Sequence, residues 1–127
     1  MKVGDYVRIK WGNGLQTISK CKNIVDMGDT QYSKDDFYIH TDHSGEVIYK
    51  TMIVKSSPNI IDLIEVGDYV NGKKVVDKQY HYTDKDNYDI GEWCIFYENV
   101  ALGDYQYNIK SIVTKEQFES MEYKIGE

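Results

Sequence analysis

The pentapeptide Val-Gly-Asp-Tyr-Val occurs twice in this chain of 127 residues, at 3–7 and again at 66–70. A second identical copy in so short a chain indicates a longer internal repeat. An Asn-Gly pair follows each copy, at 13–14 and at 71–72, and from these pairs onward the halves align with a shift of 58 residues. The repeat therefore limits the chain to folds made of two similar units.

The alignment places 37–39 on 95–97, Gly45 on Gly103 and Tyr49 on Tyr107. It assigns the extra length of the first copy to one stretch of five residues, Arg8–Gly12. We expect two tandem units, 1–65 and 66–127, each of about 60 residues, the size of a small barrel module.

Hydrophobic alternation and turn signals predict the same order of elements in both units. The expected strands of the first unit cover 6–11, 15–25, 37–41 and 46–54, and a helical turn follows over 58–63. The expected strands of the second unit cover 68–70, 73–82, 93–97, 105–113 and 123–125, with a helix over 115–121 before the last. Thr114 and Gln117 have the spacing of a capping box at this helix. The order is typical of SH3-like barrels, so we predict a mostly β protein of two tandem SH3-like small barrels, related by internal duplication, each with a short helical turn.

Composition agrees with a β fold, since the chain has 12 Tyr and one Ala, and Tyr favours strands whereas Ala favours helices. The net charge is −6, with −1 in residues 1–65 and −5 in residues 66–127. An acidic chain whose one arginine is Arg8 is a poor candidate for duplex nucleic-acid binding, which depends on Lys and Arg. The acidity favours solubility, or else a surface that meets a basic partner.

The expected location is the cytoplasm. Cys21 and Cys94 lie far apart and do not align with each other in the repeat, which favours two reduced thiols. The amino terminus has no apolar region typical of a signal peptide, and no apolar stretch approaches membrane-spanning length.

Two segments of the second unit resemble a group of small proteins encoded by phages and prophages of low-GC Gram-positive bacteria. The segments are DLIEVGDYVNG (62–72) and IKSIVTKEQFESMEYK (109–124). The resemblance implies origin and not chemistry. Small accessory phage genes of this kind often encode binders that blunt host defences, so the resemblance implies a host component as the partner.

No residue pattern predicts a metal, a cofactor or a catalytic centre. The run from Asp84 to Asp89 has Tyr and Asp where a calcium loop needs an oxygen ligand and Gly. His40 and His43 have no second ligand pair nearby in sequence, and no Ser/His/Asp or Cys/His signature is present. We expect a protein that is not an enzyme.

Aromatic side chains are the candidate binding residues of the second unit. They are Tyr80 and Tyr82 on one strand face, Trp93 and Tyr97 on another strand, and Tyr105 with Tyr107. Most of these rings must serve as core, because other large apolar residues are few, and the remainder are candidates for stacking a nucleobase or gripping a peptide.

The first unit offers a second candidate site. Alternation places Tyr6, Arg8 and Lys10 on the strand face opposite Val7, Ile9 and Trp11. A guanidinium, an ammonium and a phenol on one face can hold a small phosphate-bearing ligand, and the alternative is that the two cations are simply solvated.

These observations predict a non-enzymatic binding protein that acts on a host component, plausibly a defence system. It would either capture a small nucleotide signal, for example at an oligomer interface, or block a protein surface through its acidic second unit. The alternative is a structural or assembly protein of a phage virion.

Overall fold

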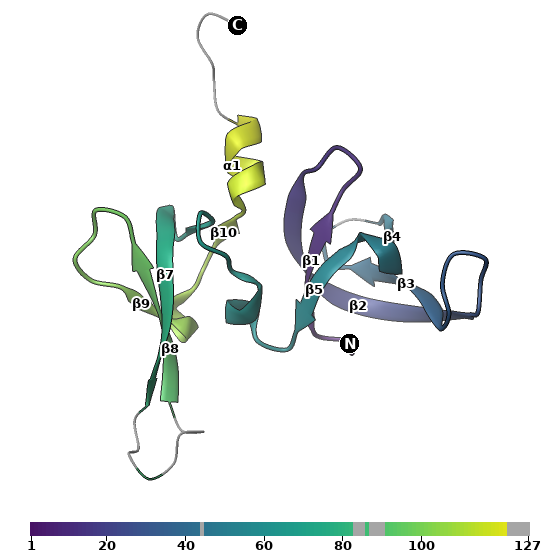
Figure 1. Ribbon diagram of the computed structural model, residues 1–127, viewed down its shortest axis with the longest axis horizontal. Helices are drawn as coiled ribbons and strands as arrows, with labels where there is room; N and C mark the ends of the chain where they lie inside the picture. The colour runs from purple at the N-terminus through teal and green to yellow at the C-terminus, as the bar shows by residue number, and fades with distance from the viewer. Residues whose placement is uncertain (44, 83–85, 87–90, 122–127) are drawn as a thin grey trace, which may run out of the picture. The chain divides into compact units, whose positions relative to one another are not determined.

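The computed structural model describes all residues except 44, 83–85, 87–90 and 122–127 (Figure 1). The chain divides into two compact units, Met1–Leu63 and Ile64–Glu127, two residues earlier than the expected boundary. Each unit contains one antiparallel sheet of five strands. The prediction of a mostly β protein is therefore confirmed.

Unit 1 contains the first five strands and two short 3-10 helices. The strands are β1 (Tyr6–Lys10), β2 (Gln16–Gly28), β3 (Asp36–Thr41), β4 (Val47–Tyr49) and β5 (Ile53–Ser57), and the helices are η1 (Lys50–Met52) and η2 (Ile60–Leu63). The sheet has the order β4-β3-β2-β1-β5. The expected single strand over 46–54 is thus divided into β4 and β5 by η1, which lets the chain cross from one edge of the sheet to the other.

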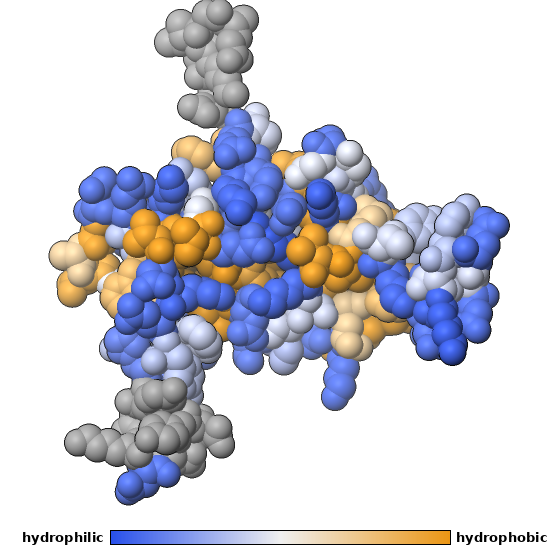
Figure 2. Space-filling model, viewed as in Figure 1, coloured by the Kyte–Doolittle hydropathy of each residue, from blue (hydrophilic) through white to orange (hydrophobic). Residues whose placement is uncertain are grey.

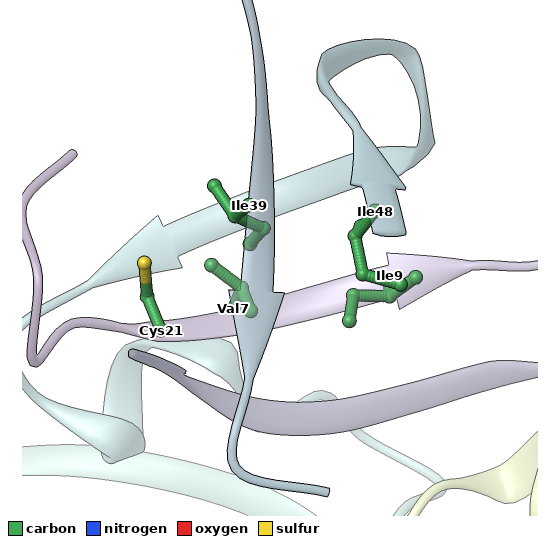
Figure 3. Close-up of a cluster of buried hydrophobic side chains, with 5 residues drawn as sticks. All are labelled: Val7, Ile9, Cys21, Ile39 and Ile48. Carbon is green, nitrogen blue, oxygen red and sulfur yellow. The ribbon is translucent and has the colours of Figure 1, made fainter. Parts of the chain in front are cut away.

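Side chains from four strands form the core of unit 1. Figure 3 shows Val7, Ile9, Cys21, Ile39 and Ile48, which are all at most 1% exposed. The alternation expected for β1 is present, because Val7 and Ile9 both lie in this cluster. Burial of each such aliphatic side chain stabilises the unit by roughly 1.5–3 kcal/mol.

Unit 2 contains five further strands, one 3-10 helix and one α-helix. The strands are β6 (Tyr69–Val70), β7 (Lys73–Tyr82), β8 (Gly91–Tyr97), β9 (Asp104–Tyr105) and β10 (Ile112–Val113), with η3 (Gln106–Asn108) before β10 and α1 (Lys115–Met121) after it. The order is β10-β6-β7-β8-β9. Here η3 interrupts the expected strand over 105–113, and the expected strand over 123–125 lies outside the described residues.

The two sheets have the same connectivity, since each runs fourth, third, second, first and fifth strand from one edge to the other. The glycines that precede the first strand of each unit also make equivalent backbone hydrogen bonds. Gly4 donates to the carbonyl of Cys21 (2.8 Å), and Gly67 donates to that of Val75 (2.9 Å). A β-bulge follows at the same place in both sheets, between Cys21 and Asn23 and between Val75 and Asp77.

The two glycines have the same backbone conformation, with φ of 95° at Gly4 and 99° at Gly67. A residue with a side chain would be strained in this conformation, which explains why both copies of the pentapeptide have glycine at this position. Cys21 and Val75 differ by 54 in number, whereas the pentapeptides differ by 63. The shift between equivalent residues is therefore not constant along the chain.

The difference arises in the first hairpin of each unit. Val7 pairs with Ser19, and Val70 pairs with Lys73. Eleven residues (8–18) therefore separate the first pair, against two (71–72) in the second. The expected insertion of Arg8–Gly12 into one arm is wrong, because the first hairpin is longer in both arms, by the paired residues 8–10 and 16–18, and also in its turn, which covers 11–15. The short turn has φ of 52° at Asn71 and 80° at Gly72, which is the geometry that an Asn-Gly hairpin signal predicts.

The 3-10 turns give a third shift. Tyr49 and Tyr105 each precede the turn, with φ and ψ of −77° and 150° at Tyr49 and −76° and 156° at Tyr105. Tyr49 is thus equivalent to Tyr105, a shift of 56, and not to Tyr107 as the 58-residue alignment predicts. Sequence alignment placed the Asn-Gly pairs together, and strand pairing shows that these turns belong to hairpins of different length.

Candidate binding surfaces

Arg8 lies inside unit 1 and is fully buried. Its Nε donates to Oε1 of Gln16 (2.6 Å), and one terminal nitrogen donates to the backbone carbonyl of Leu63 (3.0 Å). The side chain does leave β1 on the face opposite the core cluster, as alternation predicts, but η2 ends over this face. Arg8 is therefore a structural arginine that joins β1 to η2 and is not available to a ligand in solvent.

Tyr6 and Lys10, which share the strand face of Arg8, are not buried with it. Lys10 is exposed. Tyr6 is half-buried beneath Lys20, whose Nζ lies 5.8 Å from the ring centroid, and it lines a cavity of about 260 Å³ with Asp42 and His43 among its other residues. The structure thus does not assemble Tyr6, Arg8 and Lys10 into one cationic site.

The aromatic residues of unit 2 divide between the two faces of its sheet. Tyr80 pairs with Trp93, and their rings meet edge to face at 5.4 Å. Tyr105 pairs with Cys94, the residue next to Trp93. Adjacent residues of a strand point to opposite faces, so the Tyr80–Trp93 pair and Tyr105 lie on opposite sides. The side chain of Tyr82 lies outside the described residues.

Tyr97 serves the core of unit 2. It is 4% exposed, and its hydroxyl donates to Oδ2 of Asp104 across 2.6 Å. Burial and this hydrogen bond raise the pKa of Tyr97, and the same bond lowers the pKa of Asp104. Asn71 Nδ2 also donates to Asp104 (3.3 Å), so the network ties the β6–β7 turn to the start of β9.

Tyr105 and Tyr107 form an exposed stacked pair. Their ring centroids are 5.8 Å apart with an angle of 21° between the planes. Tyr105 is 43% exposed and Tyr107 is 63% exposed. A hydrogen bond to Glu92 raises the pKa of the Tyr107 hydroxyl. These two rings are therefore candidates for contact with a partner, as the sequence predicts.

A cavity in unit 1 was not expected from the sequence. We call it the unit 1 pocket; it has a volume of about 560 Å³ and is lined by Met27, Thr30, Gln31, Tyr32, Asp36, Tyr49 and Thr51. Its apolar side chains are accessible, since Met27 is 43%, Tyr49 53% and Tyr32 79% exposed. On the face of the molecule that Figure 2 shows, apolar residues form patches among hydrophilic ones. Exposed apolar side chains that gather around one cavity are typical of a binding site.

Hydrogen bonds hold the loop that forms one wall of the unit 1 pocket. Thr30 Oγ1 donates to Oδ2 of Asp36 (2.8 Å) and accepts from the backbone N–H of Tyr32 (3.1 Å). Asp29 Oδ1 accepts from the N–H of Asp35 (2.9 Å), which has a φ of 51°. The loop is thus a defined structure on which Tyr32 is presented to solvent.

Lys50, the first residue of η1, ties this loop to the other wall of the pocket, which Tyr49 and Thr51 form. Its Nζ donates to Oγ of Ser33 (3.1 Å) and to the carbonyl of Lys34 (3.0 Å). Asp36 lines the pocket, and the loop that forms one wall carries Asp29 and Asp35 against Lys34. The rim of the unit 1 pocket is therefore acidic around an apolar floor.

In the described part of the chain, no group of three or more His, Cys, Asp or Glu side chains is arranged to hold a metal ion. Asp84 and Asp89, at the two ends of the acidic run, lie outside the described residues. Cys21 and Cys94 are both free, and burial raises the pKa of each thiol, so neither is an activated nucleophile. Among the described helices, none is long and apolar enough to cross a membrane.

Comparison with protein families, with curated proteins and with solved structures finds no match to this chain.

Proposed function

We propose that the chain is a non-enzymatic binding protein and that the unit 1 pocket receives a large apolar side chain of a partner protein. The observation that carries the proposal is the concentration of Met27, Tyr32 and Tyr49 around one cavity, where each is at least 43% exposed. Side chains of this kind are enriched where proteins bind one another, because they bury large areas with few rotatable bonds.

The acidic rim specifies the neighbours of that apolar side chain. The Asp29 carboxylate accepts from the backbone N–H of Asp35 in the loop that forms one wall, and Asp36 lines the cavity itself. A partner segment with Lys or Arg beside a Leu, Met or aromatic residue complements both the floor and the rim. An acidic segment is repelled, so the same carboxylates supply specificity.

A protein partner is favoured over a small nucleotide because the cationic site expected for a nucleotide is absent from the described surface of β1. Arg8 is buried and bonded to Gln16 and Leu63, which leaves Lys10 as the exposed cation of that strand face. Among the described rings of unit 2, the Tyr80–Trp93 pair and Tyr105 lie on opposite faces of the sheet and do not form one stacking cleft.

The biological setting of the proposal follows from the resemblance of 62–72 and 109–124 to phage and prophage proteins. We propose a protein of phage origin that acts in the host cytoplasm on a host component, with a defence protein as the leading candidate. A structural or assembly role in a virion is the alternative, and it predicts a virion protein as the partner.

We also propose that the two units arose by duplication of one SH3-like barrel. The shared strand order, the glycine bonds at Gly4 and Gly67, and the bulges after Cys21 and Val75 support the duplication. A fifth strand that returns to the first after a 3-10 turn supports the SH3-like connectivity. Duplication explains how units with the same strand order came to have different surface features, a pocket in unit 1 and stacked tyrosines in unit 2.

A library of random short peptides, selected on the whole protein, tests the binding proposal. The expected enriched peptides carry a large apolar residue beside Lys or Arg, and calorimetry should show that Tyr32→Ala and Tyr49→Ala weaken their binding by roughly tenfold each. Val54→Ala is the matched control, because Val54 is 49% exposed on unit 1 and does not line the pocket. Equal binding by the parent and both pocket variants would refute the assignment.

A further inference from the structure

We propose that the stacked pair of Tyr105 and Tyr107, together with Glu92, is a site for an arginine side chain of a partner. This site lies in unit 2 and shares no residue with the unit 1 pocket. The proposal therefore goes beyond the proposed function and can fail independently of it.

The three side chains lie on one face of the unit 2 sheet. Tyr105 pairs with Cys94, and Glu92 precedes Cys94 by two residues on β8, so Glu92 points to the same side as Tyr105. The Tyr107 ring stacks on Tyr105 with centroids 5.8 Å apart, and the Glu92 carboxylate is near enough to raise the pKa of the Tyr107 hydroxyl. An aromatic surface and a carboxylate are thus adjacent.

The backbone around the pair is fixed to β8. Gln106, the residue between the two tyrosines and the first of η3, accepts at Oε1 from the N–H of Trp93 (3.0 Å) and so anchors η3 to β8. A Cβ at Gly103 would lie 2.3 Å from the carbonyl of Ile95, so a glycine is required where the chain enters β9. The two rings are therefore presented at set positions before a ligand arrives, which reduces the entropy lost on binding.

Exposure makes the rings accessible to a ligand. Tyr107 is 63% exposed although it is already stacked, so one ring face or edge remains open to solvent. Val100 and Leu102 precede the pair in the same run and are 38% and 81% exposed. They are further exposed apolar side chains of the segment that leads into β9.

Arginine fits this arrangement better than lysine. A guanidinium is planar, stacks on aromatic faces and pairs with a carboxylate through two parallel hydrogen bonds, whereas an ammonium is a strongly hydrated point charge. The net charge of −5 over residues 66–127 further favours a cationic segment. An anionic ligand is disfavoured for the same reason.

Nitrogen-15 NMR of the whole protein tests the site with a blocked peptide of glycine and arginine and its lysine counterpart. The arginine peptide should shift the amide signals of Glu92, Gln106 and Tyr107, and the lysine peptide should bind at least about threefold more weakly. Tyr107→Ala and, as a second variant that keeps the rings, Glu92→Gln should each weaken arginine binding by roughly threefold to tenfold.

Tyr32→Ala is the matched control, since Tyr32 is a similarly exposed tyrosine that belongs to the unit 1 pocket. It should leave binding of the arginine peptide unchanged even though it impairs the pocket. Equal binding of the arginine and lysine peptides, unaltered binding by both unit 2 variants, or no shift at these amides would each overturn the proposal.

Discussion

Lys50 donates a hydrogen bond from Nζ to the backbone carbonyl of Lys34 across 3.0 Å, and so ties η1 to the loop between β2 and β3. Because this loop presents Tyr32, we predict that Lys50→Met weakens ligand binding at the unit 1 pocket with a loss of stability of about 1 kcal/mol. Hydrogen exchange should show faster exchange at the amides of the loop. Lys55→Met is the control, because Lys55 is an exposed lysine of β5, and it should leave both properties unchanged.

Asp68 is fully buried, and its carboxylate joins the start of unit 2 to α1. Oδ2 accepts from the N–H of Glu65 (2.9 Å), and Oδ1 accepts from the N–H of Lys115 (3.0 Å). We predict that Asp68→Ala lowers the free energy of unfolding by about 3 kcal/mol, because two part-buried backbone donors lose a fully buried acceptor that joins them. Chemical denaturation measures the change.

The repeat supplies a matched control for Asp68. Asp5 holds the same place in the first pentapeptide, but it is half-exposed, and its Oδ2 accepts from the N–H of Lys2 (3.0 Å) in an exposed setting. Asp5→Ala should therefore cost no more than about 1 kcal/mol. Equal losses at the two aspartates would show that burial of Asp68 does not add to its contribution.

The capping box predicted at the start of α1 is present. Thr114 Oγ1 accepts from the N–H of Gln117 (3.1 Å), and Gln117 Oε1 accepts from the N–H of Thr114 (3.0 Å). We predict that Thr114→Ala lowers the free energy of unfolding by about 1 kcal/mol, while Thr114→Ser, which keeps the oxygen, costs clearly less. Thermal unfolding of Thr114→Ala within error of the parent would show that the bond does not stabilise the helix.

The hydrogen bond between Tyr97 and Asp104 makes stability depend on pH at both extremes. The bond lowers the pKa of Asp104 from its ordinary 3.8, so this contribution is present above about pH 4 and is lost as the pH falls through the lowered folded value. Burial and the same bond raise the pKa of Tyr97 from its ordinary 10.0, so that contribution is present below pH 10 and is lost as the pH rises further. Tyr97→Phe should flatten both limbs of the stability curve measured by denaturation. Limbs as steep as those of the parent would assign the pH dependence to other groups.

Local signals predicted several elements of the fold. β7 (Lys73–Tyr82) and α1 (Lys115–Met121) have the bounds that the sequence predicts. The Asn-Gly turn marks the start of β7 and the capping box marks the start of α1, and each signal consists of residues that are close together in sequence. The register of the repeat was not predictable in this way. Its true shift changes from 63 to 54 within one hairpin, and strand pairing, which joins distant residues, is what reveals it.

The candidate sites show the same limit. Alternation placed Arg8 on the correct face of β1, but its partner Leu63 is 55 residues away, so burial by η2 could not be read from the strand. The unit 1 pocket forms where the loop of Tyr32 meets the chain at Tyr49 and Thr51. Tyr32 stands in a polar run, and an exposed aromatic residue in such a run is the signal that sequence reasoning passed over.

Affinity capture from bacterial lysate, with mass spectrometry of both proteins and small molecules, tests whether the unit 1 pocket binds a partner protein. We expect the parent and Val54→Ala to retain the same protein, Tyr32→Ala and Tyr49→Ala to lose it, and no nucleotide to be released on denaturation. A bound nucleotide, or a protein retained equally by both pocket variants, would refute binding of a partner protein at this pocket.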